Sequence, residues 1–478
     1  MIDSARGRRA ATFVLATSVA LATFCGAQGA VAGSPRASSA ASLDGVWRMD
    51  GYGTVVSIED GRRRMREYET AGAGCLPGDV TELTGTSATV TPAGPGRARL
   101  GYASSVGHRT LRRIDALPGA CREAHPAKNP RAVFDTFWQT YAENYPFFGA
   151  KGIDWRAVRD RYRPRITDRT TDEELFAVLT KMIEPLHDGH TYLRRGDCSV
   201  NPGYCFGGHR EDTPFPSGEL IGKIDASVTA QVGADRLQKW GSGKGKGKIA
   251  YAELPDGIGY LRLTGFVNYT DEHTFAADSA ELDRALDAVL APGRNPRGLV
   301  LDLRFNGGGS DRLGLQVAER LTDRPYTAYL KHARNDPKDP RGFTPAEPVR
   351  VVPHRGAVHT GPVAVLTGRL TFSAGETTTQ ALMGRTPEVV RIGQNTNGSF
   401  SDILERRLPN GWGFGLPNEE FLDPATGRSY DGDGIAPDVR VPVFTDEEFA
   451  SGRDSALTEA RRRLTGRKSS PSGGTSQR

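Results

Sequence analysis

The 478-residue sequence lacks the features that would assign it to several common classes of protein. It has no apolar run of the roughly 20 residues that a membrane-spanning helix needs, so we expect no stable membrane insertion. Its 62 basic and 57 acidic residues are interspersed and nearly balanced, which argues against a nucleic-acid partner. It has no internal repeat and none of the paired Cys-x-x-Cys motifs that zinc sites favour. With 37% hydrophobic residues and 58 glycines, the composition is that of a globular protein rather than of a collagen, a coiled coil or a disordered chain.

The N-terminus has the pattern of an export signal. Several arginines precede an apolar run over residues 10–24, and Ala30 and Ala32 form the small-x-small pattern of a cleavage site. We therefore predict a signal peptide over residues 1–32 and a secreted, extracellular protein. Twin-arginine export through the arginine pair at residues 8–9 is an alternative route to the general secretory one.

The few cysteines indicate an oxidising compartment. Cys25 lies in the predicted signal peptide, where a lipid anchor is the alternative reading, although the bulky residue before it fits an anchor badly. The other four form an even set, which in an exported protein usually pairs as disulfides. Of three possible connectivities we favour Cys75–Cys121 and Cys198–Cys205, because each pair lies within one predicted structural unit.

The patterns change along the chain and divide it into structural units. Residues 44–125 contain short strand-like runs separated by turn residues, which is typical of a small antiparallel β domain. Residues 126–193 have the apolar spacing of helices and carry a histidine motif. In residues 251–445 apolar strands alternate with helices, which predicts an α/β core with a buried, largely parallel sheet. The other predicted units are a disordered linker at 33–43, a loop-rich disulfide segment with a Gly/Lys linker at 194–250, a helix at 446–466 and a disordered tail at 467–478.

Three loops at the ends of predicted elements carry candidate chemistry. The loop FNGGGSD at 305–311 lets backbone N–H groups surround a negative oxygen, and no Gly-Lys-Ser/Thr follows that would make it a phosphate loop. The loop at 366–376 sets Ser373 between a strand and the helix expected at 374–383, where position alone favours a helix cap. A third loop places His190 just past a helix. Together these groups are the nucleophile, oxyanion donors and base that acyl transfer requires.

Four motifs, GLVLDLRFNGGG, TFSAGE, PLHDGHTYL and GDGIAPDV, occur in an order that resembles the C-terminal processing, or tail-specific, serine peptidases. The resemblance is to the branch near the tricorn core and the interphotoreceptor retinoid-binding repeats, and it covers about residues 131–443. It implies a crotonase-like (ClpP/crotonase-type) β/α core and peptide-bond hydrolysis. Too few residues lie between His190 and the strand near Ala250 for the PDZ domain that many such peptidases carry.

The resemblance also implies roles for individual residues. Ser373 matches the nucleophile, and His190 matches the histidine base of the tricorn-like branch. Ala374, together with Gly307 or Gly308, matches the donors of the oxyanion hole.

The sequence departs from the family pattern at three places. Ser399 stands where the Ser–Lys peptidases have their lysine, and no lysine occurs between Lys338 and Lys468. Gly189 replaces the serine that precedes the histidine in the tricorn branch. The acid of that branch aligns with Asp431, which is one methylene shorter.

Asp188 and Glu376 are the alternative acids that could orient the base.

From the motifs and the resemblance we expect a serine endopeptidase that hydrolyses peptides or unfolded proteins through an acyl-enzyme on Ser373 and uses no metal or organic cofactor. The alternative is a non-catalytic binding protein for apolar ligands or peptides on the same fold.

Overall fold

The computed structural model describes residues 42–466, apart from residues 62, 73, 84–86, 123–126, 215, 292, 295 and 340. The predicted signal peptide, all but the end of the predicted linker, and the predicted tail lie outside the described residues. Within the described part of the chain, no helix is long and apolar enough to cross a membrane.

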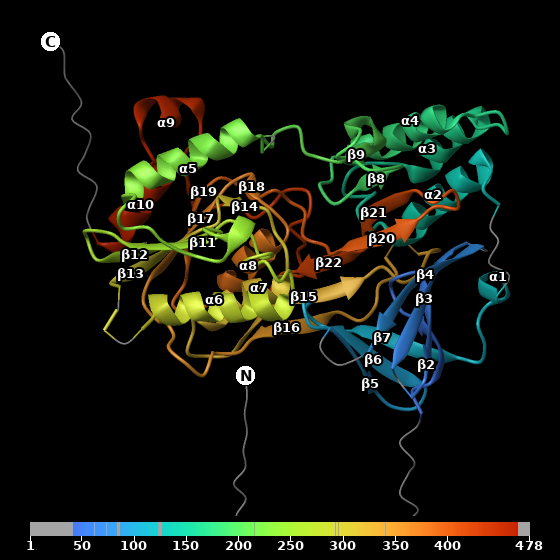
Figure 1. Ribbon diagram of the computed structural model, residues 1–478, viewed down its shortest axis with the longest axis horizontal. Helices are drawn as coiled ribbons and strands as arrows, with labels where there is room; N and C mark the ends of the chain where they lie inside the picture. The colour runs from blue at the N-terminus through green and yellow to red at the C-terminus, as the bar shows by residue number, and fades with distance from the viewer. Residues whose placement is uncertain are drawn as a thin grey trace, which may run out of the picture. The chain divides into compact units, whose positions relative to one another are not determined.

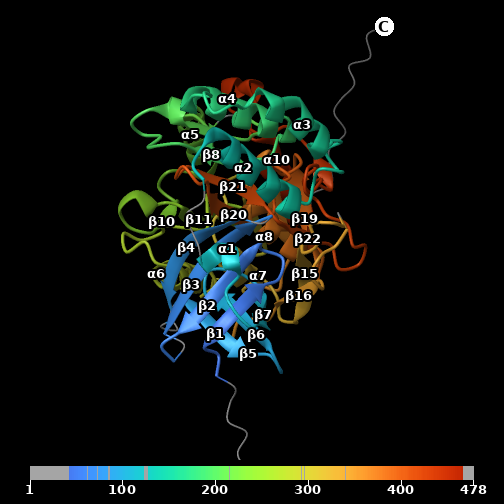
Figure 2. The same ribbon diagram turned by 90° about the vertical axis from the view of Figure 1, so that its right-hand side faces the viewer.

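The N-terminal part is a seven-stranded antiparallel sheet with the order β4-β3-β2-β1-β7-β6-β5 (Figure 2). Strand β6 alternates between buried and exposed side chains, as expected where one face packs and the other meets solvent, whereas β2 is buried at five successive positions. The Cys75–Cys121 disulfide ties β4 to the short helix α1. The bounds are β1 Gly45–Met49, β2 Thr54–Glu59, β3 Arg64–Ala71, β4 Gly74–Glu82, β5 Ala88–Pro92, β6 Arg97–Tyr102, β7 Arg109–Ile114 and α1 Gly119–Arg122.

Three helices follow the sheet: α2 (Pro130–Asn144), α3 (Trp155–Tyr162) and α4 (Asp172–Ile183). Each begins at a residue whose side chain accepts a hydrogen bond from the first turn, and α4 has a full capping box between Thr171 and Glu174. The buried aromatic residues of α2 share one hydrophobic cluster with the inner face of the N-terminal sheet. The helices and the N-terminal sheet are therefore packed on a common core.

A second seven-stranded sheet has the order β10-β11-β12-β13-β17-β19-β23, and its labelled strands β11, β12, β13, β17 and β19 lie in the left half of Figure 1. Its last five strands are parallel, and β12, β13 and β17 are buried on both faces because helices cover both sides. Helices α6, α7 and α8 cover one face, and α5 and α10 cover the other. The strands are β10 Gln238–Trp240, β11 Ile249–Glu253, β12 Ile258–Leu263, β13 Gly298–Asp302, β17 Val363–Thr367, β19 Val390–Gly393 and β23 Val439–Arg440. The helices are α5 Gly218–Val232, α6 Phe275–Val289, α7 Asp311–Glu319, α8 Ala374–Met383, α9 Asp446–Ser451 and α10 Ser455–Leu464. The predicted α/β fold class is confirmed.

Three small sheets bring distant loops together. The pair β14–β18 is parallel and sets the glycine loop beside the loop that carries Ser373. The order β20-β21-β8-β9 joins the strand after His190 to a late hairpin. The bounds are β8 Tyr192–Arg194, β9 Cys205–Gly207, β14 Phe305–Asn306, β15 Tyr326–Ala333, β16 Glu347–Val351, β18 Leu370–Thr371, β20 Ile403–Arg407, β21 Gly413–Pro417 and β22 Glu419–Leu422, with 3-10 turns at Arg163–Arg165, Glu184–Leu186, Pro202–Tyr204 and Gly243–Gly245.

A fully buried arginine fastens the C-terminal helix to the central sheet. Arg304 lies 2.6 Å from Asp302 and 2.7 Å from Asp454, and Asp454 caps the N-terminus of α10. All three side chains are buried. Because two carboxylates share one guanidinium with several hydrogen bonds, each charge has its partner.

The structure differs from expectation between residues 194 and 250, where we predicted mostly loops. Helix α5 lies there, with Ile224, Val228 and Val232 buried along one face. Because Gly218 and Gly222 lie near the start of this helix, the four-residue spacing of its apolar side chains did not lead to a helix prediction. The Gly/Lys tract, predicted as an exposed linker, is a tight turn in which a Cβ on Gly245 would overlap the backbone oxygen of Asn268. The predicted final helix is two helices, because Gly452 adopts a left-handed conformation with φ 62° and ends α9.

Candidate active site

Ser373 lies on a sharp turn between β18 and α8. Its φ of 53° and ψ of −120° fall in a region that side chains disfavour, and such strain persists only where surrounding contacts impose it. The following residues of α8 are buried, whereas Ser373 is partly exposed. A strained strand-to-helix turn that presents a serine at the start of a helix is the geometry by which hydrolases expose a nucleophile.

A buried carboxylate holds this turn in place. Glu376 accepts hydrogen bonds from the N–H groups of Ser373 at 3.3 Å, Gly398 at 2.6 Å and Ser399 at 2.8 Å. Burial raises the pKa of Glu376 to about 7, against the hydrogen bonds that favour its charged form. Glu376 therefore links the backbone of Ser373 to the loop at residues 396–399.

The glycine loop packs directly against the serine. A Cβ on Gly308 would lie 2.5 Å from the Cβ of Ser373 and 3.0 Å from its Oγ, and Gly308 and Gly309 have φ values of 81° and 129°. Only glycine fits both requirements. Asn306 shapes the loop, since its side chain accepts the N–H of Gly308 at 3.0 Å and donates to a backbone oxygen.

Some backbone N–H groups of the site already have a hydrogen-bond acceptor, and others do not. Gly307 donates its N–H to Thr264 O at 3.2 Å, and Gly308 donates to Asn306, so both oxyanion donors predicted in the glycine loop have acceptors. Among the described residues, the N–H groups of Ala374 and Gly309 make no hydrogen bond. Asn306 and Gly309 were not singled out in the sequence, although an asparagine before a glycine run is a signal for a side-chain-supported turn.

His190 lies in the loop after α4 and is buried. Its ring meets the ring of Phe372 edge-on at 4.6 Å, so the histidine loop packs against the residue before Ser373. The backbone N–H of His190 donates to the side chain of Asp188 at 3.0 Å, and Asp188 also accepts from the hydroxyl of Tyr145 at 2.9 Å. Burial lowers the pKa of His190 below 6.5, while the charges of Asp188 and Asp402 act in the opposite direction.

The imidazole is not yet engaged with the serine. Within the described residues, His190 Nδ1 has no hydrogen-bond partner, and no hydrogen bond joins the ring to Ser373 Oγ. Catalytic hydrogen bonds of this kind are often long without substrate and tighten when it binds.

Asp431 forms no hydrogen bond with Ser373 or His190. It accepts the N–H of Phe400 at 3.1 Å and the hydroxyl of Ser429 at 3.0 Å. Burial raises its pKa well above the usual value, and the negative charges of Asp188 and Glu376 add to this. Of the three predicted acids, Asp188 binds the backbone of His190, Glu376 binds the backbone of Ser373, and Asp431 holds neighbouring loops.

Packing explains the glycine before the histidine. A Cβ on Gly189 would lie 2.5 Å from the ring of Phe372 and 3.5 Å from Ser399 Oγ. A serine at this position therefore fits only if Phe372 moves. Ser399 stands beside it and donates its hydroxyl to Asn397 at 3.0 Å.

Across the described ranges, no group of three His, Cys, Asp or Glu residues is arranged to hold a metal ion.

The fold is similar to that of the serine peptidase class that includes the tail-specific enzymes. The model for Peptidase family S41 matches residues 257–441, and that for the Tricorn protease C1 domain matches residues 126–184. The chain belongs to the tail-specific group of family S41, a family of serine peptidases. The predicted family resemblance is confirmed.

Two curated relatives share parts of the sequence. Tricorn protease homolog 1 of Streptomyces coelicolor is 26% identical over 403 residues, which cover 70% of this chain and 35% of the relative. The chloroplastic C-terminal processing peptidase of Tetradesmus obliquus is 29% identical over 198 residues, which cover 40% of this chain and 38% of the relative. The chain thus spans little more than a third of the length of the curated relatives it matches.

Solved structures share the fold. The crystal structure of a proposed peptidase from Parabacteroides merdae is 27% identical with a TM-score of 0.58, and the alignment covers 71% of this chain and 97% of that one. The structure of mature CPAF, at 12% identity and a TM-score of 0.50, covers 71% of this chain and 96% of its own, which shows a shared fold.

Proposed function

We propose that the protein is an exported serine endopeptidase that cleaves peptides or unfolded proteins through an acyl-enzyme on Ser373. One observation carries the proposal: Ser373 sits on a strained turn at the start of a buried helix, with Gly308 packed against its Oγ. A helix N-terminus and a glycine loop place backbone N–H groups around the atom where negative charge develops.

The proposed reaction begins with proton transfer. His190 takes the proton from Ser373 Oγ as the oxygen attacks the scissile carbonyl carbon. The same imidazolium then protonates the leaving amine, and the acyl-enzyme remains. A water molecule, deprotonated by His190, hydrolyses this ester and restores the serine. His190 is suited to the first step because burial keeps it neutral at pH 7.

The oxyanion forms between the two loops. The N–H of Ala374 is the first donor, because it has no acceptor within the described residues. In the glycine loop the unused N–H belongs to Gly309, whereas Gly307 and Gly308 must exchange their present acceptors for the oxyanion. Asp188 is the carboxylate best placed to stabilise the imidazolium, since it already binds the backbone of His190.

The proposed extracellular location is supported by two disulfides, Cys75–Cys121 and Cys198–Cys205, which are the pairs expected from the sequence. Structural disulfides persist in oxidising compartments outside the cytosol.

Labelling with a serine-directed phosphonate tests the proposal. We expect wild-type protein to gain one covalent adduct that peptide mass spectrometry maps to Ser373, and we expect Ser373→Ala to gain none. Ser227→Ala, on the outer helix α5, is the matched control and should label like wild type. An unlabelled wild-type protein that binds apolar ligands or peptides would instead favour the non-catalytic alternative.

A further inference from the structure

The segment after the histidine loop has no role in the chemistry proposed above, yet it runs across the site. The chain leaves the histidine loop through β8, passes round a loop closed by the Cys198–Cys205 disulfide, and returns as β9. β9 pairs antiparallel with β8, with Tyr192 opposite Gly207. We name residues 205–213 the strap.

The first end of the strap is fixed to the histidine loop. The N–H of Gly208 donates to Thr191 O at 2.8 Å. A Cβ on Gly208 would overlap the carbonyl oxygen of Asp188, so glycine alone permits this approach. The strap therefore touches both residues that flank the stretch from Gly189 to His190.

The middle of the strap reaches the loop that contains Asp431. The guanidinium of Arg210 donates to Gly432 O, and it forms a two-pronged ion pair with Asp212 at 2.9 and 3.2 Å. Gly432 in turn donates its N–H to Gly398 O at 2.8 Å. A single side chain thus connects the strap with the two loops that surround Asp431.

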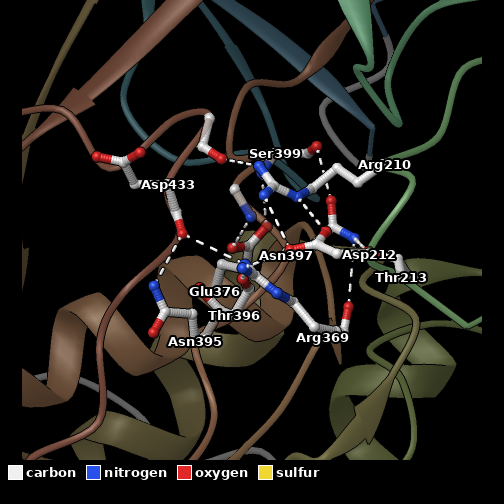
Figure 3. Close-up of polar contacts among 12 residues, drawn as sticks. Arg210, Asp212, Thr213, Arg369, Glu376, Asn395, Thr396, Asn397, Ser399 and Asp433 are labelled. Atoms are coloured by element: carbon white, nitrogen blue, oxygen red, sulfur yellow. Dashed lines mark hydrogen bonds and ion pairs between the residues drawn. The ribbon is translucent and has the colours of Figure 1, made fainter.

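The far end of the strap reaches the loop before the nucleophile. Asp212 pairs with Arg369 at 2.6 Å, and Arg369 also donates to Thr396 O at 2.8 Å (Figure 3). Thr213 accepts a hydrogen bond from the side chain of Asn397 at 3.3 Å. Arg369 precedes Ser373 by four residues, and the loop at 396–399 is the one that Glu376 ties to the backbone of Ser373.

This network is more than a pair of surface charges. The side chains of Arg210 and Arg369 are only 22% and 20% exposed, and both bind carbonyl oxygens as well as Asp212. Hydrogen bonds from Arg210 and the charge of Arg369 hold the pKa of Asp212 below its usual value, so the shared carboxylate stays charged. Networks with several charge-assisted hydrogen bonds fix geometry better than isolated ion pairs do.

We propose that the strap sets the positions of the histidine loop, the loop that contains Asp431 and the loop before Ser373 relative to one another, and that Arg210 is the positioning residue at its centre. The inference rests on the proposed serine peptidase function. The strap binds loops, and Arg210 acts through the carbonyl of Gly432 and through Asp212 and Arg369. Loss of the network displaces His190 from Ser373 without removing a contact to substrate, so it lowers kcat and leaves KM nearly unchanged.

Steady-state kinetics of Arg210→Ala on a peptide substrate test the proposal. We expect kcat to fall by about 10- to 100-fold, the cost of a small misplacement of reacting groups, with KM changed less than about threefold. Arg210→Lys keeps the charge but not the fork, so it should recover part of kcat. Arg163→Ala removes a similar two-pronged pair with Asp135 in the helical part and should leave kcat unchanged.

Two further results decide the matter. If the network acts as one unit, Arg210→Ala combined with Asp212→Ala should cost no more than the larger single effect. Should Arg210→Ala not fold, Arg210→Lys and Thr213→Val weaken the same network less severely, and each should lower kcat by a smaller factor at constant KM.

A wild-type kcat in the folded variants would overturn the proposed role of the strap. So would a loss of kcat/KM that comes entirely from a higher KM. A wild-type protein that neither labels with phosphonate nor cleaves peptide would overturn the proposed function instead, so the two failures are distinguishable.

Discussion

Two sets of buried carboxylates in this molecule differ in what surrounds them. Asp302 and Asp454 share the guanidinium of Arg304, and although burial opposes it, that charge holds the pKa of Asp302 below its usual value. Glu376 and Asp431 face backbone N–H groups and a hydroxyl, and burial raises the pKa of both. The first set is structural. In the second set, Glu376, with a pKa of about 7, can change protonation near neutral pH, which is characteristic of functional sites.

The largest expected effect concerns His190, the proposed base, and tests whether the second set belongs to a functional site. His190→Ala should lower kcat/KM by about 100- to 10,000-fold, the usual contribution of general acid–base catalysis. In wild type, the neutral imidazole is the proposed active form and burial lowers its pKa, so kcat/KM should fall as pH is lowered, with a midpoint below 6.5. A profile that is flat from about pH 5 to 9 would remove His190 from the mechanism.

The next effect tests the structural role of the first set. Arg304→Met leaves Asp302 and Asp454 buried without a counter-charge, which should lower the free energy of unfolding by about 3–5 kcal/mol in a denaturant titration. Arg453→Met removes an exposed pair with Glu447 and serves as control, with almost no change expected. Equal stability of the two variants would mean that the buried trio is not a structural anchor.

The smallest effect concerns Glu376, the acid that binds the backbone of Ser373. Glu376→Gln places an NH2 group against an N–H donor, so one hydrogen bond to the loop is lost and kcat should fall about 10-fold. The stability profile gives a second readout. The pKa of Glu376 is about 7 in the folded protein and 4.5 normally. Between pH 4.5 and about 7, Glu376 is therefore protonated more often in the folded state than in the unfolded state.

Wild type should therefore lose stability as pH rises from 4.5 to about 7, and Glu376→Gln should lose less over the same window. Unfolding free energies at both ends of the window give the comparison. Parallel curves for the two proteins would show that Glu376 does not titrate there.

Much of the core was predictable because its signals are local. The helix expected at 374–383 is α8, and the apolar strands of the sheet lie where their runs predict them. The glycine loop and Ser373 were expected to meet because both follow parallel strands, and the β14–β18 pair brings them together.

The rest depends on contacts that leave no pattern in the sequence. Arg210 and Gly432 are 222 positions apart and meet through a side chain and a carbonyl, for which no spacing rule exists. Asp431 was expected to orient the base, but its oxygens bind Phe400 and Ser429, because a buried carboxylate takes the nearest donors that the loops supply. That role for Asp431 remains a prediction.

The backbone of Ser373 has a consequence for anyone who compares variants of this protein. A φ of 53° is imposed on a residue with a Cβ, at a typical cost of about 1–3 kcal/mol. Alanine inherits that cost in full and differs from serine only by one oxygen atom. Glycine escapes it, so a glycine variant mixes the loss of the hydroxyl with a relaxed main chain, and alanine is the faithful reference.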